Sequence, residues 1–199
     1  MRTFISALAL TMLLTVITGL IYPLAVCGVA QVIFPGQAHG SLIVHGDKVV
    51  GSSLIGQNFS SPRYFQGRPS AAGDKGYDAA NSGGSNLAPT NHALIDAVRL
   101  RLKNFMDSNP GAGPSQVPID IVTTSGSGLD PEISPAAADL QVARVAHARG
   151  LSEDQVRRLI AENTRPRAAG IFGEPGVNVL LLNLALDRLA ASHGGSSGT

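Results

Sequence analysis

The feature that most constrains this chain is a long uncharged run near its N-terminus. After Arg2, no Asp, Glu, Lys or Arg occurs before Asp47, and residues 4–34 are almost wholly apolar or small. An α-helix rises 1.5 Å per residue, so about 20 apolar residues cross the hydrocarbon core of a bilayer. The run therefore predicts one membrane anchor helix within residues 1–35, with Pro23 inside it or near its outer end.

A cleaved export signal is the competing interpretation, because such signals also place an apolar stretch after a basic residue. The apolar core of a signal is about 7–15 residues long, and this run is about twice that. Val26 before Cys27 also makes a poor lipoprotein-type cleavage site. We therefore expect a retained anchor. Because Arg2 precedes the run and the next basic residue is Lys48, the positive-inside rule predicts a cytoplasmic N-terminus and a C-terminal domain outside the cytoplasm. A domain without disulfides suits a bacterial periplasm.

The composition excludes one class of function. Only 15% of residues are charged and 44% are hydrophobic, against about 25% charged in an average soluble domain. The formal net charge of +1 provides no field that would attract a polyanion, so we expect no nucleic-acid partner. Cys27 is the one cysteine, so no disulfide is expected and the exported domain must rely on a hydrophobic core.

The chain after the anchor predicts an α+β fold, in which residues 36–191 form a mixed α/β extracytoplasmic domain and residues 192–199 a disordered tail. Alternating apolar residues, capping residues and Gly/Pro breaks give the individual elements. They are a hairpin over 41–50, an ordered irregular region over 51–89, a helix starting near Thr90 or Asn91, a connection over 109–118, a strand over 117–122, a helix from Ser134 to about 149, a helix from a Ser152–Gln155 capping box to about 163, and a buried helix over 177–189.

The sequence contains none of the common local motifs for catalysis. None of Lys48, Lys75 and Lys103 follows a glycine, so no Walker A loop is present. The sequence around Ser127 lacks the outer glycines of a nucleophile elbow, and no G-x-G-x-x-G occurs. The five histidines are scattered without metal-ligand spacing. We expect no catalytic residue and no metal, although a triad assembled from distant residues stays open.

The segment NSGGSN at 81–86 has two interpretations. Small residues with free amides can wrap an anion, and the Ser-Gly-Gly core is similar to the nucleotide-contacting signature of ABC transporter ATPases. The same residues also make a tight ordered turn. The predicted periplasmic location favours the turn.

Several longer motifs carry a family resemblance. They are YP at 22–23, GSL at 40–42, GSSLIGQNF at 51–59, YFQGRPS at 64–70, SGGSNL at 82–87, TSGSGLDP at 124–131 and VNVL at 177–180. In this order they resemble the C subunit of the Kdp-type potassium-transporting P-type ATPase, and the resemblance extends from the anchor to about Leu189.

The resemblance implies a non-catalytic accessory subunit of a high-affinity potassium uptake pump in the bacterial inner membrane. In that family a channel-like subunit conducts potassium, and a P-type subunit hydrolyses ATP. The C subunit is described as a catalytic chaperone that raises the ATP affinity of the hydrolysing subunit, so we expect no cofactor of its own and ATP only through the complex. The alternative is a membrane-anchored periplasmic hydrolase or binding protein.

Thirteen residues are predicted to contact partners. Small or hydroxylated residues let helices approach closely in lipid, although a threonine can instead bond its own i−4 carbonyl. Arg68 is expected to direct its guanidinium at a carboxylate or at carbonyls, the alternative being a solvent-exposed side chain. The glycines of the 125–131 loop are expected to adopt positive φ, and Asp130 to accept backbone N–H groups. The full set is Thr11, Thr15, Gly19, Tyr22, Arg68, Ser82, Gly83, Gly84, Ser85, Asn86, Gly126, Gly128 and Asp130.

Overall fold

The structure, a computed structural model, describes residues 1–194, with side chains described through residue 190. Contacts divide the chain into two compact units, residues 1–52 and the part that begins at Ser53. Both units contain helices and strands that pair antiparallel, so the fold is α+β with one long apolar helix near the N-terminus, as predicted.

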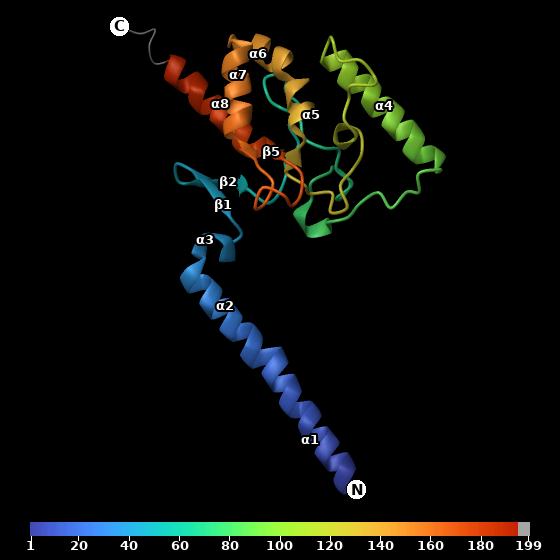
Figure 1. Cartoon of the computed structure of the whole chain (residues 1–199), viewed down its shortest axis with the longest axis vertical. Coiled ribbons are helices and arrows are strands. Elements are labelled where there is room, and N and C mark those ends of the chain that lie inside the picture. The colour runs from blue at the N-terminus through green and yellow to red at the C-terminus, as the bar shows by residue number, and fades with distance from the viewer. Residues whose placement is uncertain (195–199) are drawn as a thin grey trace. The chain divides into compact units, whose positions relative to one another are not determined.

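The first unit begins with one continuous helix (Figure 1), made of α1 (Arg2–Val16), a π-helical turn η1 (Ile17–Ile21) and α2 (Tyr22–Ile33). It has 32 residues and a mean hydropathy of 2.3, and it is the one helix among residues 1–194 that is long and apolar enough to cross a membrane. Pro23 lies in the first turn of α2. Because proline has no N–H, the ladder shifts there, and the Tyr22 N–H donates to Ile17 O, five residues back.

The predicted hairpin is confirmed. After α3 (Pro35–Ala38), β1 (Leu42–His45) pairs antiparallel with β2 (Lys48–Ser52), with an irregularity between Ile43 and Val44. Gly46 supplies the positive φ of +61° that a tight turn needs.

The second unit opens with the irregular region that the sequence predicts. Between Ser53 and Asn91 the only helix is the short 3-10 turn η2 (Ala79–Asn81). Phe65 is fully buried, as expected for a region ordered by its own large side chains, whereas Leu54 is 62% exposed. Among the large side chains of this region only Phe65 is buried, and Phe59, Tyr64 and Tyr77 are half-buried.

The predicted helix caps are confirmed because each depends on residues close in sequence. Asn91 caps α4 (His92–Ser108) by accepting the Ala93 N–H at 2.8 Å. Ser134 caps α5 (Pro135–Asp139), and the Ser152–Gln155 capping box begins α7 (Glu153–Glu162).

The helix predicted from Ser134 to about residue 149 is interrupted, which the sequence did not indicate. It ends as α5 at Asp139, and α6 (Val142–Arg149) follows after a break at 140–141. At the break the Gln141 side chain accepts the Gln66 N–H at 2.8 Å and donates to Gln66 O at 3.1 Å. A long-range tertiary contact therefore fixes the point at which the helix bends.

The strand predicted over 117–122 is wrong. These residues contain the 3-10 turn η3 (Ile119–Ile121), in which the Val122 and Thr123 N–H groups both donate to Ile119 O, at 3.2 and 2.9 Å. Pro118 supplies no N–H for a ladder. Ile121 and Val122 are also both buried, although they are adjacent, which a strand with one buried face does not allow.

The sheet of the second unit comes from residues that the sequence assigned elsewhere. β5 (Gly176–Asn178) lies between β3 (Glu132–Ile133) and β4 (Thr164–Arg165), and both pairings are antiparallel. β5 is fully buried and leads directly into α8 (Val179–Gly194), so its apolar residues read as the start of the helix. The helix includes residues 192–194, the first three of the predicted tail, and residues 195–199 lie outside the described part.

The core of the second unit forms where α5, α6, α7 and α8 gather around β5 (Figure 1). Its fully buried members include Phe65, Val142, Val156, Leu182 and Leu186. Phe65 belongs to the irregular region, so this segment is an integral part of the core.

Candidate functional site

The predicted partner-binding residues of the long helix all lie on its exposed surface. Thr11 and Thr15 belong to α1, Gly19 to the π turn, and Tyr22 begins α2. The Thr15 hydroxyl donates to Thr11 O at 2.8 Å, which is the alternative i−4 bond considered for this residue. The Thr15 hydroxyl is thus engaged within the helix, and the partner contact of this face stays a prediction.

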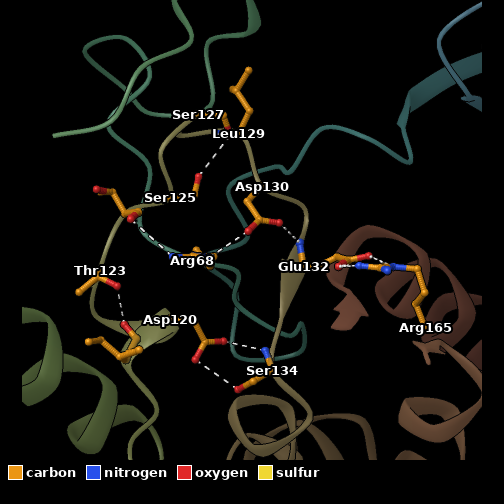
Figure 2. Close-up of polar contacts among 12 residues, drawn as sticks. Arg68, Asp120, Thr123, Ser125, Ser127, Leu129, Asp130, Glu132, Ser134 and Arg165 are labelled. Carbon is orange, nitrogen blue, oxygen red and sulfur yellow. Dashed lines mark hydrogen bonds and ion pairs between the residues drawn. The ribbon is translucent and has the colours of Figure 1, made fainter. Parts of the chain in front are cut away.

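Arg68 directs its guanidinium as predicted. Nη1 donates to Asp130 Oδ2 at 3.0 Å, and Nη2 lies 3.5 Å from the carbonyl oxygen of Thr124 (Figure 2). The Arg68 side chain is 22% exposed and that of Asp130 31%, so the pair is partly shielded from solvent. The Arg68 Nε is buried and has no hydrogen-bond partner among the described residues.

Asp130 accepts a backbone N–H, as expected. Its Oδ1 takes the Glu132 N–H at 2.9 Å, while Oδ2 holds Arg68. Glu132 in turn forms a bidentate ion pair with Arg165, at 2.9 and 2.7 Å (Figure 2). The two adjacent pairs connect the irregular region to the edge of the sheet, since Glu132 lies in β3 and Arg165 in β4.

The segment at 82–86 packs against the 125–130 loop. The Gly83 N–H and the Ser82 hydroxyl both donate to Ser127 O, at 2.8 and 2.9 Å. A Cβ on Gly84 would lie 3.1 Å from Gly126 O. The segment is thus held on the neighbouring loop through Ser82 and Gly83, but residues 82–86 do not form the predicted tight turn. Its remaining predicted members are Ser85, half-buried, and Asn86, exposed at a φ of +52°.

Positive φ in the 125–130 loop occurs at Gly128 and not at Gly126, which corrects the expectation for Gly126. Gly128 has a φ of +67°, and a Cβ there would contact Gly83 O and lie 2.9 Å from the Ala72 nitrogen. A Cβ on Gly126 would meet nothing within 4 Å. The loop therefore depends on a glycine at residue 128 for both conformation and space.

Tyr77 and Ser70 complete this arrangement, and the sequence did not indicate their role. The Tyr77 hydroxyl donates to Arg68 O at 2.6 Å, and the Tyr77 N–H donates to the Ser70 hydroxyl oxygen at 2.7 Å. The Ser70 hydroxyl donates to Gly128 O at 2.5 Å. Burial, together with the charge of Asp130, raises the pKa of Tyr77 to about 12. We call Arg68, Ser70, Tyr77, residues 82–86 and residues 125–130 the loop cluster.

A second network, also missed by sequence reasoning, holds residues 62–66 on the helices. Asn183 of α8 accepts the Phe65 N–H at 2.9 Å and donates to Phe65 O at 3.0 Å. Arg144 of α6 donates to the carbonyl oxygens of Pro62 and Tyr64, at 2.6 and 3.0 Å. Burial lowers the pKa of Arg144 to about 10. The backbone groups of this segment thus form hydrogen bonds with a side-chain amide and a guanidinium instead of with a neighbouring strand.

Comparisons with known proteins show which family the sequence resembles over most of its length. The family model described as "KdpC: K+-transporting ATPase, c chain" matches residues 4–188. The chain is 56% identical over 187 residues to a potassium-transporting ATPase KdpC subunit of Variovorax paradoxus, covering 94% of this chain and 96% of that protein. It is 57% identical over 182 residues to the protein of the same name from Sorangium cellulosum, covering 91% and 95%. Both the long helix and the loop cluster lie within the matched residues.

Proposed function

Because this chain belongs to the KdpC family, the c chain of K+-transporting ATPases, we propose that it stabilises a high-affinity potassium uptake pump and raises the ATP affinity of the hydrolysing subunit. It is a subunit of the ATPase rather than an enzyme on its own. The observation that carries the proposal is the extent of the match, since residues 4–188 include both the long apolar helix and the domain that follows it.

The proposed location is the bacterial inner membrane, with one span, a cytoplasmic N-terminus and a periplasmic C-terminal domain. The helix of residues 2–33 and its apolar composition support the span, and Arg2 before it with no basic residue until Lys48 supports the orientation. Single cysteines introduced at exposed Arg99 or Asp107, in a Cys27→Ser chain, should react with a membrane-impermeant maleimide added from the periplasmic side. Labelling only after the inner membrane is permeabilised would contradict this orientation.

The proposed partners are a channel-like subunit that conducts potassium and a P-type subunit that hydrolyses ATP, in addition to the membrane itself. The exposed face of the helix with Thr11, Thr15 and Gly19 is proposed to pack on partner helices. The loop cluster is proposed to form a rigid surface for a partner outside the membrane. Its support is that the Gly83 N–H, the Ser82 hydroxyl and the Arg68–Asp130 pair are engaged internally, so these groups require little ordering on binding.

The effect on ATP follows from linkage, with no cofactor bound by this chain. If the subunit binds the ATP-bound form of its partner more tightly than the ATP-free form, it must raise the affinity of that partner for ATP. The same factor must then describe how much ATP tightens the binding of the subunit. Couplings of this kind are typically about 5- to 150-fold.

The test measures both sides of this linkage. The Kd for a non-hydrolysable ATP analogue is determined for the pump with and without this subunit, and the Kd for the subunit is determined with and without the same analogue. We expect the two ratios to agree and to exceed about fivefold. Equal ATP affinity in the two pump preparations would contradict the proposed role.

The alternative, a membrane-anchored hydrolase or small-molecule binding protein, makes a different prediction. Its activity would persist in the isolated chain without any pump subunit. No described feature favours it over the accessory role, and turnover by the purified chain alone would establish it.

A further inference from the structure

A cavity of about 320 Å³ lies beside the loop cluster and is bordered by two arginines. Arg68 lines it from the irregular region, and Arg101 lines it from α4. The side chains of Asn58, Gln66 and Asn104 add amide groups to the same lining. Its volume falls at the lower end of the range for small-molecule sites, about 300–1,000 Å³.

The cavity is lined by basic residues but by no acidic residue. No Asp or Glu belongs to its lining. Asp130, which pairs with Arg68, lines a separate cavity of about 300 Å³ together with Asp120, Glu132 and Glu174. Arg68 borders both cavities and its charge is paired with Asp130, so the uncompensated positive charge in the lining of the first cavity is that of Arg101.

The arginines also retain hydrogen-bonding capacity. Among the described residues, Arg101 makes one hydrogen bond, from Nη1 to Val122 O at 3.1 Å, and forms no ion pair. A guanidinium has five N–H donors, so donors of Arg101 remain for a ligand. The Arg68 Nε is buried and is not accessible to a ligand in the cavity, so the free donors come mainly from Arg101.

We infer that this cavity binds a small oxyanion, either a phosphate or a carboxylate group, between Arg68 and Arg101. Planar guanidinium groups bind both anions bidentately, and the surrounding amides can donate to the remaining oxygens. The apolar wall, which includes Phe59 and Phe105, leaves room for a short organic body attached to the anion. The site does not depend on the proposed role in ATP binding.

The test uses the full-length chain in detergent, with inorganic phosphate and succinate as probes. At equal ionic strength, a probe present at about ten times its Kd should raise the unfolding temperature by about 3 to 6 °C more than sodium chloride does. Stronger stabilisation by phosphate assigns the site to phosphate groups, and stronger stabilisation by succinate assigns it to carboxylates. Stabilisation by neither probe beyond that of chloride overturns the inference.

Two variants on one helix test whether the cavity is responsible. Arg101→Gln should weaken binding of the effective probe at least tenfold, measured by isothermal titration calorimetry. Arg99→Gln is the matched control, because Arg99 is 75% exposed, pairs with Asp96 and does not line the cavity. If Arg101→Gln does not fold, Arg101→Lys replaces it and should weaken binding while charge is retained. Equal weakening by the Arg99 and Arg101 variants would overturn the site.

Discussion

Gly128 is the residue at which the backbone of the loop cluster has the least freedom. Its φ of +67° disfavours any side chain, and a Cβ would press on the backbone of Gly83 and Ala72. We expect Gly128→Ala to lower the free energy of unfolding by about 2–4 kcal/mol. Gly126→Ala is the control, with an expected change within about 0.5 kcal/mol, since a Cβ there meets open space. Denaturant unfolding of both variants measures the difference, and equal losses would be inconsistent with the described loop.

Tyr77 gives the same cluster a predicted pH dependence. Its pKa is about 12 in the folded protein and about 10 when unfolded, because burial and Asp130 disfavour the phenolate. Below pH 10 both states keep the proton. Between pH 10 and 12 the unfolded state loses it first, so folding stability falls as the pH rises. Tyr77→Phe should flatten this part of the stability curve. An unchanged slope in the variant would contradict the assignment.

At the scale of elements, two buried amides, one in the break between α5 and α6 and one on α8, anchor the irregular region. Gln141, between α5 and α6, pairs with both backbone groups of Gln66, and Asn183 of α8 pairs with those of Phe65. Each amide is buried, so removing either leaves unpaired polar groups inside the protein. We expect Gln141→Ala and Asn183→Ala each to cost about 2–3 kcal/mol.

The double variant and a control complete this prediction. Because Phe65 and Gln66 are adjacent, the two losses should be non-additive in a double-mutant cycle. Gln116→Ala is the control, since Gln116 is exposed and accepts only a nearby Gly113 N–H, and its cost should stay within about 0.5 kcal/mol. A Gln141 variant as stable as the Gln116 variant would show that the amide pairing contributes little.

These amides also mark the limit of sequence reasoning. Helix starts at Asn91, Ser134 and Ser152 were predictable because a cap and the N–H it accepts lie within three residues. The pairing of Arg68 with Asp130 was predicted only as a guanidinium directed at some carboxylate, since 62 residues separate the two. The break at Gln141 and the strand β5 were missed because both depend on distant partners. Local chemistry thus predicts where elements begin, and tertiary pairing decides where they bend or change type.

At the scale of the whole molecule, the long helix is proposed to hold the subunit in its complex through a face of small residues. Ala7, Thr11, Thr15 and Gly19 recur every four residues, and the Thr15 hydroxyl is already bonded within the helix. Partner contact at Thr15 must then depend on close approach of the helices rather than on its hydroxyl. Thr11→Leu combined with Thr15→Leu adds bulk to this face and makes the segment more apolar, so insertion should be normal while assembly weakens.

The measurement is recovery of the complete pump by affinity purification of a partner subunit, alongside the amount of this subunit in the membrane. We expect the double variant to reach wild-type levels in the membrane but to co-purify several-fold less. Ala9→Leu is the matched control, because residue 9 lies on the opposite side of the helix from residues 7 and 11 and its enlargement leaves that face intact. Full recovery of the pump with both threonines replaced would show that this face contacts lipid, and the site of assembly would then have to lie elsewhere on the subunit.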